Sequence, residues 1–99
     1  MKIDFSKELI GYDGEPLKEG GKILTLAMIC CNALMNQTEE DAKLPGEEKL
    51  RRFDLATVVY ASKEPLDVKV EDISLLKTLV GKLYGPIVVG PVWKMLEGE

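Results

Sequence analysis

The chain of 99 residues contains no histidine. Histidine is the commonest general base and metal ligand, so its absence argues against catalysis and metal binding. The sequence also has no CxxC spacing, because its two cysteines, Cys30 and Cys31, are adjacent. Adjacent cysteines rarely bridge each other, and we expect two reduced thiols that act as small apolar side chains. The sequence therefore predicts a protein that is not an enzyme and uses no metal or cofactor.

Aromatic and basic residues are scarce. Six aromatic residues leave little surface for base stacking, and 13 basic against 17 acidic residues give a net charge of −4. A nucleic-acid-binding protein usually carries a basic face, so we do not expect nucleic acid as a partner. The one concentrated positive patch is Lys49, Arg51 and Arg52. Such a patch is typical of the solvated face of a helix, and a contact with phosphate or with an acidic partner is the alternative.

Long apolar runs are missing as well. The longest, Leu26 to Cys31, is far shorter than the roughly 20 residues that span a membrane. The first residues are charged at every second or third position, unlike a signal peptide. We therefore expect a cytoplasmic protein without a membrane partner.

The sequence is otherwise that of a globular domain. Hydrophobic residues make up 45% and charged residues 30%, and a chain of this length supports one domain over residues 1–99. Alternating apolar residues predict a strand over residues 2–10. The turn formers Asp13 and Gly14 follow, and a return through Leu17 and Lys18 would pair with that strand.

Helical patterns fill the remainder of the chain. Thr25 is placed to cap an apolar helix over residues 26–35, and Thr38 to cap one turn in the following connector. A second helix begins near Gly46 and ends before Pro65. Its apolar stripe is expected to consist of Leu50, Phe53, Thr57 and Tyr60, widened by Ala56 and Val59.

Two more helices complete the pattern. Val68 and Val70 predict a short strand or an extended entry, and Glu71 and Asp72 open the next helix. Pro86 is suited to the first position of a last helix. Because Gly90 and Pro91 fall inside that helix, we expect them to kink or split it.

Two segments are candidates for an interaction surface. The helix over residues 26–35 is apolar almost all round, so it is either the central core helix or shared with a second copy of the chain. The segment from Tyr84 to Trp93 carries two Gly-Pro dipeptides, which favour a tight inter-helix turn or a rigid docking surface for another protein. The candidate surface residues are Met28, Leu34, Tyr84, Pro86, Pro91 and Trp93.

The order of these elements supports a family resemblance. A charged strand, an Asp-Gly turn and a Leu-Thr-Leu helix start precede the segments GEEKLRRFDLA (46–56) and VEDISLLKTLVGKLYGPIVVGPVW (70–93). The chain resembles a group of small proteins of tailed phages and prophages, most of which have no assigned function. The resemblance implies a phage or prophage origin and expression in the cytoplasm of a bacterial host. It supplies no catalytic residues.

Together these observations predict an α+β fold, in which an N-terminal β-hairpin packs on a bundle of three to four α-helices. We expect a small non-enzymatic phage or prophage protein that acts through protein–protein interaction, with an assembly partner or a host factor. Self-association is a further expectation. The alternative function is a nucleic-acid-linked phage regulator that uses Lys49, Arg51 and Arg52 on phosphates.

Overall fold

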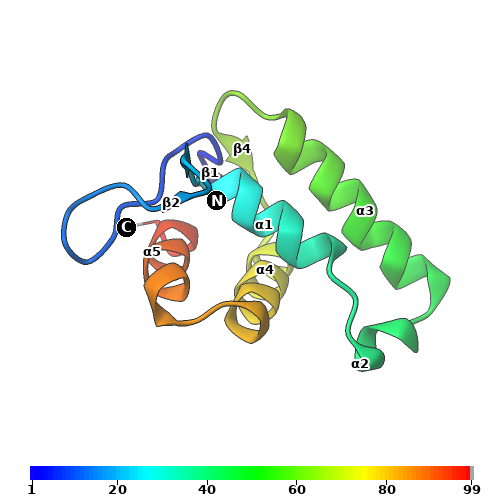
Figure 1. Ribbon diagram of the computed structural model, residues 1–99. Coiled ribbons are helices and arrows are strands. Elements are labelled where there is room, and N and C mark those ends of the chain that lie inside the picture. Colours follow the sequence, from blue (N-terminus) through cyan, green and yellow to red (C-terminus); the bar gives the residue numbers. More distant parts are fainter. Residues whose placement is uncertain (99) are drawn as a thin grey trace.

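A computed structural model describes residues 1–98 of the protein. Over these residues the chain forms five helices and four strands of two residues each (Figure 1). The N-terminal β-structure lies against the helices, so the predicted α+β class and its arrangement are confirmed. Among the described residues, no helix is long and apolar enough to cross a membrane.

Helix α1 (Leu26–Met35) is the central helix. The Thr25 hydroxyl accepts a hydrogen bond from the Met28 N–H at 3.3 Å, which confirms the predicted cap. The helix packs against α3 (Gly46–Ala61) on one side and α4 (Val70–Leu83) on the other. Its buried side chains are Leu26, Ile29, Cys30, Ala33 and Leu34. This burial explains the near absence of polar residues.

Helix α2 (Glu39–Ala42) is the single turn expected after Thr38. The Thr38 hydroxyl accepts from the Asp41 N–H, and the Asp41 carboxylate accepts from the Thr38 N–H, which completes a capping box. The Asp41 carboxylate also accepts a hydrogen bond from the Thr38 hydroxyl at 2.9 Å. The two hydrogen bonds that it accepts from Thr38, more than the one from the Arg52 guanidinium, hold the pKa of the Asp41 carboxyl below its ordinary value.

The predicted apolar stripe of α3 is confirmed at Ala56 and Val59 and wrong at its other four residues. Phe53 is 57% exposed and Tyr60 81% exposed, and Leu50 and Thr57 also face solvent. The buried residues are Ala56 and Val59, on the face that meets α1. A small side chain at position 56 lets α1 approach, and the Cys31 thiol lies 3.5 Å from the Ala56 carbonyl oxygen. Helix α3 thus turns larger apolar side chains outward.

The expected strand pairing is confirmed in part: the end of the segment 2–10 does pair with the return after Gly14, through the antiparallel Ile10–Pro16 bridge, but its beginning does not. Strand β1 (Lys2–Ile3) is antiparallel to β4 (Leu66–Asp67), far along the chain, rather than to the segment after Gly14. The regular hairpin joins β2 (Lys18–Glu19) to β3 (Lys22–Ile23). Its turn residues, Gly20 and Gly21, both have positive φ, which glycine adopts without strain. The Asp13-Gly14 turn does reverse the chain, since the Leu17 N–H donates to the Leu9 carbonyl at 2.9 Å.

Helix α5 (Pro86–Leu96) begins with Pro86 and is continuous, so the expected split at Gly90-Pro91 is wrong. Pro91 lies little more than a turn from the start of the helix and removes one hydrogen bond, the one to the Ile87 carbonyl. Gly90 has no Cβ to meet the proline ring, which relieves the usual restriction on the residue before a proline. The helix continues because this single loss occurs at its exposed side, where both Ile87 and Gly90 lie.

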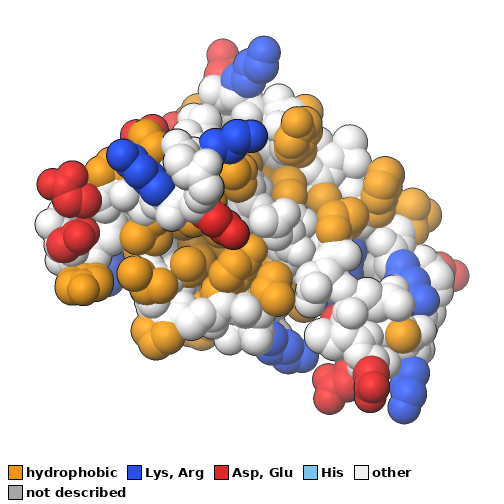
Figure 2. All heavy atoms as spheres, in the orientation of Figure 1, with side chains coloured by type: hydrophobic (Ala, Val, Ile, Leu, Met, Phe, Trp, Pro, Cys, Tyr) orange, Lys and Arg blue, Asp and Glu red, His pale blue; other side chains and the backbone are white. Residues whose placement is uncertain are grey.

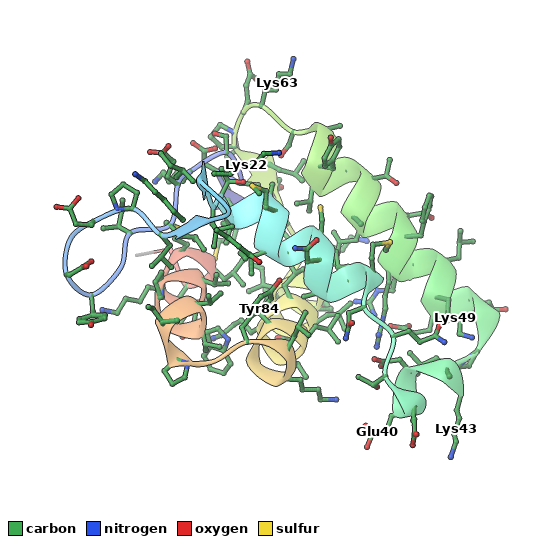
Figure 3. All side chains as sticks on the ribbon, viewed as in Figure 1. Lys22, Glu40, Lys43, Lys49, Lys63 and Tyr84 are labelled. Carbon is green, nitrogen blue, oxygen red and sulfur yellow. The ribbon has the colours of Figure 1, made fainter. Side chains whose placement is uncertain are left out.

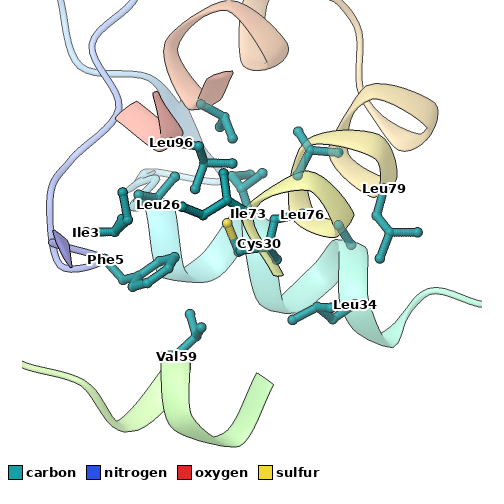
Figure 4. Packing of buried hydrophobic residues seen from close by; sticks show 14 of the residues in the cluster. Ile3, Phe5, Leu26, Cys30, Leu34, Val59, Ile73, Leu76, Leu79 and Leu96 are labelled. Carbon is teal, nitrogen blue, oxygen red and sulfur yellow. The ribbon is translucent and has the colours of Figure 1, made fainter. Parts of the chain in front are cut away.

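One hydrophobic core joins these elements. Figure 4 shows Phe5 and Leu26 next to Cys30 of α1, with Leu76 of α4 and Leu96 of α5 closing the cluster. No polar or charged side chain of residues 1–98 is buried. Among the buried side chains of these residues, the only titratable group is the Cys30 thiol.

Candidate interaction surface

The main candidate site is a groove between α5 and the loop that precedes β2. Figure 1 shows this loop beside α5, and the hollow between them has a volume of about 630 Å³. We call it the α5 groove. Its lining includes Ile10, Tyr12, Pro86, Ile87, Pro91 and Lys94. Apart from Lys94, these are large apolar or aromatic side chains, which is typical of surfaces that bind another protein.

The loop side of the groove is fixed by its backbone. The Gly11 N–H donates to the Glu15 carbonyl at 2.8 Å, and the Asp13 carboxylate accepts from the Glu15 N–H at 3.1 Å. Gly14 has a φ of +80°, which a side chain would make unfavourable. A Cβ at Gly11 would lie 3.0 Å from a Leu17 methyl group, a tight contact that the Leu17 side chain would have to relieve by moving. The turn holds Tyr12 outward, with 93% of its surface exposed.

The helical side of the groove follows from the prolines. Pro86, Ile87, Gly90, Pro91 and Lys94 are spaced so that they share one face of α5. Because Pro91 has no N–H, the Ile87 carbonyl has no helical donor on this face. The groove therefore combines an apolar wall with one cation, at Lys94.

Only part of the predicted surface lies in this groove. Pro86 and Pro91 line it, whereas Trp93 lies on another face of α5, against α4. The Trp93 indole N–H donates to the Lys77 carbonyl at 3.1 Å, and the Lys77 ammonium lies 4.7 Å from the ring centroid. Tyr84 is half-buried and contacts the core, and Figure 3 shows it directed inward. Trp93 and Tyr84 thus attach α5 to the other helices.

The two remaining predicted surface residues lie on α1. Leu34 is only 3% exposed, so its assignment to an interaction surface is wrong: it faces the core between α3 and α4. Met28 is partly exposed and shares an outer stripe of α1 with Asn32 and Met35, three and four residues apart. The structure does not bring Met28 to the α5 groove. Figure 2 shows hydrophobic side chains gathered over α5 and along α3.

The three basic residues predicted as a phosphate patch are engaged within the protein. Arg51 contacts Asp72 at 2.8 Å and Glu48 at 3.2 Å, and Arg52 contacts Asp41 at 3.1 Å. These ion pairs connect α3 to α2 and α4. Lys49 donates to the Ala42 carbonyl at 3.2 Å, and Figure 3 shows it at the same end of the molecule as α2. The guanidinium groups therefore stabilise contacts between helices.

The two cysteines and the possible metal ligands are the other groups of chemical interest. Both cysteines are free thiols, and burial raises the pKa of the Cys30 thiol to about 12. Burial also raises the pKa of the Cys31 thiol. Neither cysteine has the lowered pKa of a nucleophilic thiol. Within residues 1–98, no three side chains of the metal-binding types lie close enough together to hold a metal ion.

Sequence reasoning missed Ile10 and Tyr12. Both were read only as part of a strand and a turn, and their role depends on α5, which lies more than 70 residues later. An exposed tyrosine between two glycines was the one available signal.

Comparison of the chain with known protein families, with curated proteins and with solved structures finds no match.

Proposed function

We propose that the protein works without catalysis, by binding another protein through the α5 groove. The observation that carries this proposal is the exposed apolar wall formed by Tyr12, Ile87 and Pro91 on a rigid frame. Burying apolar side chains of this kind on a partner is favourable, at about 25 cal/mol for each Å² removed from water. The frame is ordered before binding, so little conformational entropy opposes the contact.

The proposal includes the origin suggested by the sequence. The segments 46–56 and 70–93 resemble small phage and prophage proteins, and the proposed place of action is the cytoplasm of a bacterial host. An assembly partner or a host factor would occupy the α5 groove. The pairing of Arg51 and Arg52 with carboxylates favours this function over a nucleic-acid-linked regulator, because those guanidinium groups are already neutralised.

The test compares two variants that make the same tyrosine-to-serine change on different surfaces of the protein. Tyr12→Ser removes the aromatic side chain of the groove, and Tyr60→Ser removes an equally exposed one on α3. Each tagged protein is cross-linked in host lysate, with and without phage infection, and the retained proteins are quantified. A protein that wild type and Tyr60→Ser retain and Tyr12→Ser loses would support the proposal.

One outcome of this experiment would contradict the proposal. If every retained protein is kept by Tyr12→Ser and by Ile87→Ser, the α5 groove is not the binding surface. Sedimentation at several concentrations separates a second copy of the chain from another protein as the occupant. A self-association that Tyr12→Ser abolishes would assign the groove to a second copy.

A further inference from the structure

A second hollow lies on the opposite side of the bundle, between α3, β4 and the start of α4. Its volume is about 710 Å³. We call it the acidic groove. Its lining includes the apolar Leu50, Val58 and Leu66 and the carboxylates of Glu47, Asp54 and Glu71. None of these residues lines the α5 groove, so the two surfaces are independent.

The apolar part of the acidic groove is open to solvent. Leu50 is 59% exposed, and Val58, eight residues later on the same face of α3, is also exposed. Eight residues are about two helical turns, or about 12 Å along the axis. The core occupies a different face of α3, at Ala56 and Val59. These two aliphatic side chains are therefore accessible to a partner.

The charges of the acidic groove indicate what kind of partner can bind there. Five acidic and two basic residues line it, and one of the basic residues, Arg51, is already paired with Asp72. Among residues 1–98, Glu47, Asp54 and Glu71 take part in no ion pair. A purely apolar occupant would leave these carboxylates desolvated and unpaired, which is unfavourable. The occupant must therefore carry cations beside its apolar side chains.

The backbone around the acidic groove favours a helical occupant over a strand. Strand β4 has two residues and already pairs with β1, so it offers little backbone for an added strand. The repeat of Leu50, Asp54 and Val58 along α3 instead presents the ridges against which another helix packs. An amphipathic helix with basic residues on each side of an apolar stripe satisfies both the shape and the charge.

We propose that the acidic groove binds a basic amphipathic helix of another protein. Leu50 and Val58 contact its apolar stripe, and Glu47, Asp54 and Glu71 pair with its lysine or arginine side chains. Helix α3 of a second copy does not fit this description, because its own cations are engaged in the contacts already described. The proposal does not depend on the α5 groove.

The test uses a labelled peptide of leucine and lysine, about 18 residues long, with leucine at helical spacing so that it forms about five turns. Its binding to the full chain is followed by fluorescence anisotropy. We expect Leu50→Ser to weaken binding about tenfold, which corresponds to about 1.4 kcal/mol. Phe53→Ser, at an equally exposed position of α3 that does not line the acidic groove, should leave binding unchanged. Asp54→Asn with Glu71→Gln should weaken binding and reduce its dependence on salt.

Several outcomes would overturn the proposal. One is equal binding by wild type and Leu50→Ser, with both folded by circular dichroism. Another is equal binding of a peptide of the same composition whose leucines are scattered round the helix. A third concerns Glu19 and Glu64, two exposed carboxylates outside the groove. If Glu19→Gln with Glu64→Gln weakens peptide binding as much as Asp54→Asn with Glu71→Gln does, the acidic groove is not the site. A dimer of the chain alone that Leu50→Ser dissociates would assign the groove to a second copy.

Discussion

Pro91→Ala is expected to stabilise the protein, because Pro91 lies inside α5 and cannot donate the hydrogen bond that a helix requires there. An alanine N–H at this position would meet the carbonyl oxygen of Ile87, four residues earlier. Ile87 and Pro91 both line the α5 groove. Pro91 therefore lowers stability at the surface that we propose for binding.

The magnitude follows from the surroundings of Pro91. Inside a helix, proline costs about 3 kcal/mol relative to alanine. Here Gly90 removes the Cβ clash, and the exposure of Ile87 lets water reach the unpaired carbonyl, so the cost is smaller. Proline also restricts the unfolded chain, which offsets about 0.4–1 kcal/mol. We expect a net gain of about 1–2 kcal/mol, which at about 4–8 °C per kcal/mol raises Tm by about 5–15 °C.

The assay is urea and thermal unfolding followed by circular dichroism. A shift of the urea midpoint at unchanged slope would report stability alone. A midpoint equal to or below that of the wild type would refute the reasoning that α5 carries an unpaired carbonyl.

A double-mutant cycle gives an internal control. Gly90→Ala should gain about 1 kcal/mol in the Pro91→Ala background, from helix propensity. With Pro91 present, the added Cβ meets the proline ring, and the gain should vanish. Additive effects would contradict the part that we assign to Gly90.

Four further outcomes are expected. Gly81→Ala should stabilise the protein by about 0.5–1 kcal/mol, because glycine inside a helix is less favourable than alanine. The added Cβ would contact Trp93 at 3.4 Å, an ordinary distance, and a lower urea midpoint would contradict this prediction. Leu76→Ala should destabilise it by about 2–5 kcal/mol, since this side chain is fully buried in α4, and a smaller loss in chemical unfolding would show that the core collapses around it. The Asp41 carboxyl has a lowered pKa in the folded state, so Asp41→Asn should be less stable than wild type at neutral pH. That difference should disappear as the pH falls below 3.8 and through the lowered pKa, as unfolding curves at several pH values would show. With the other thiol replaced by serine, Cys30 should resist a thiol reagent at pH 8 until the chain unfolds, and rapid labelling of the native protein would refute its burial.

Local rules predicted the elements well where the signal was local. Thr25 and Thr38 cap helices because a hydroxyl accepts the first free N–H groups whatever lies around it. Asp13 and Gly14 reverse the chain because Gly14 adopts positive φ, which costs glycine nothing. Such signals act over a few residues, and their outcome does not depend on the fold.

The apolar pattern of α3 was not sufficient to predict which of its residues are buried. Leu50, Phe53 and Tyr60 lie at helical spacing in the sequence, yet the residues of α3 that are buried in the core are Ala56 and Val59. Close packing against α1 requires small side chains at the crossing, and the spacing of apolar residues does not say where another helix crosses. The same limit applied to Leu34, which was taken as a surface residue before its neighbours were known.

The sequence by itself determined the helices, their caps and the absence of histidine or of a membrane-spanning segment, because each depends on residue type and short-range spacing. Only the tertiary structure decided which apolar side chains remain exposed and which meet across the chain. It placed Tyr12 beside α5 and Leu66 beside α3, and it paired Arg51 and Arg52 with carboxylates of α4 and α2. These contacts join residues far apart in the sequence, and their energies depend on distances that no local pattern contains.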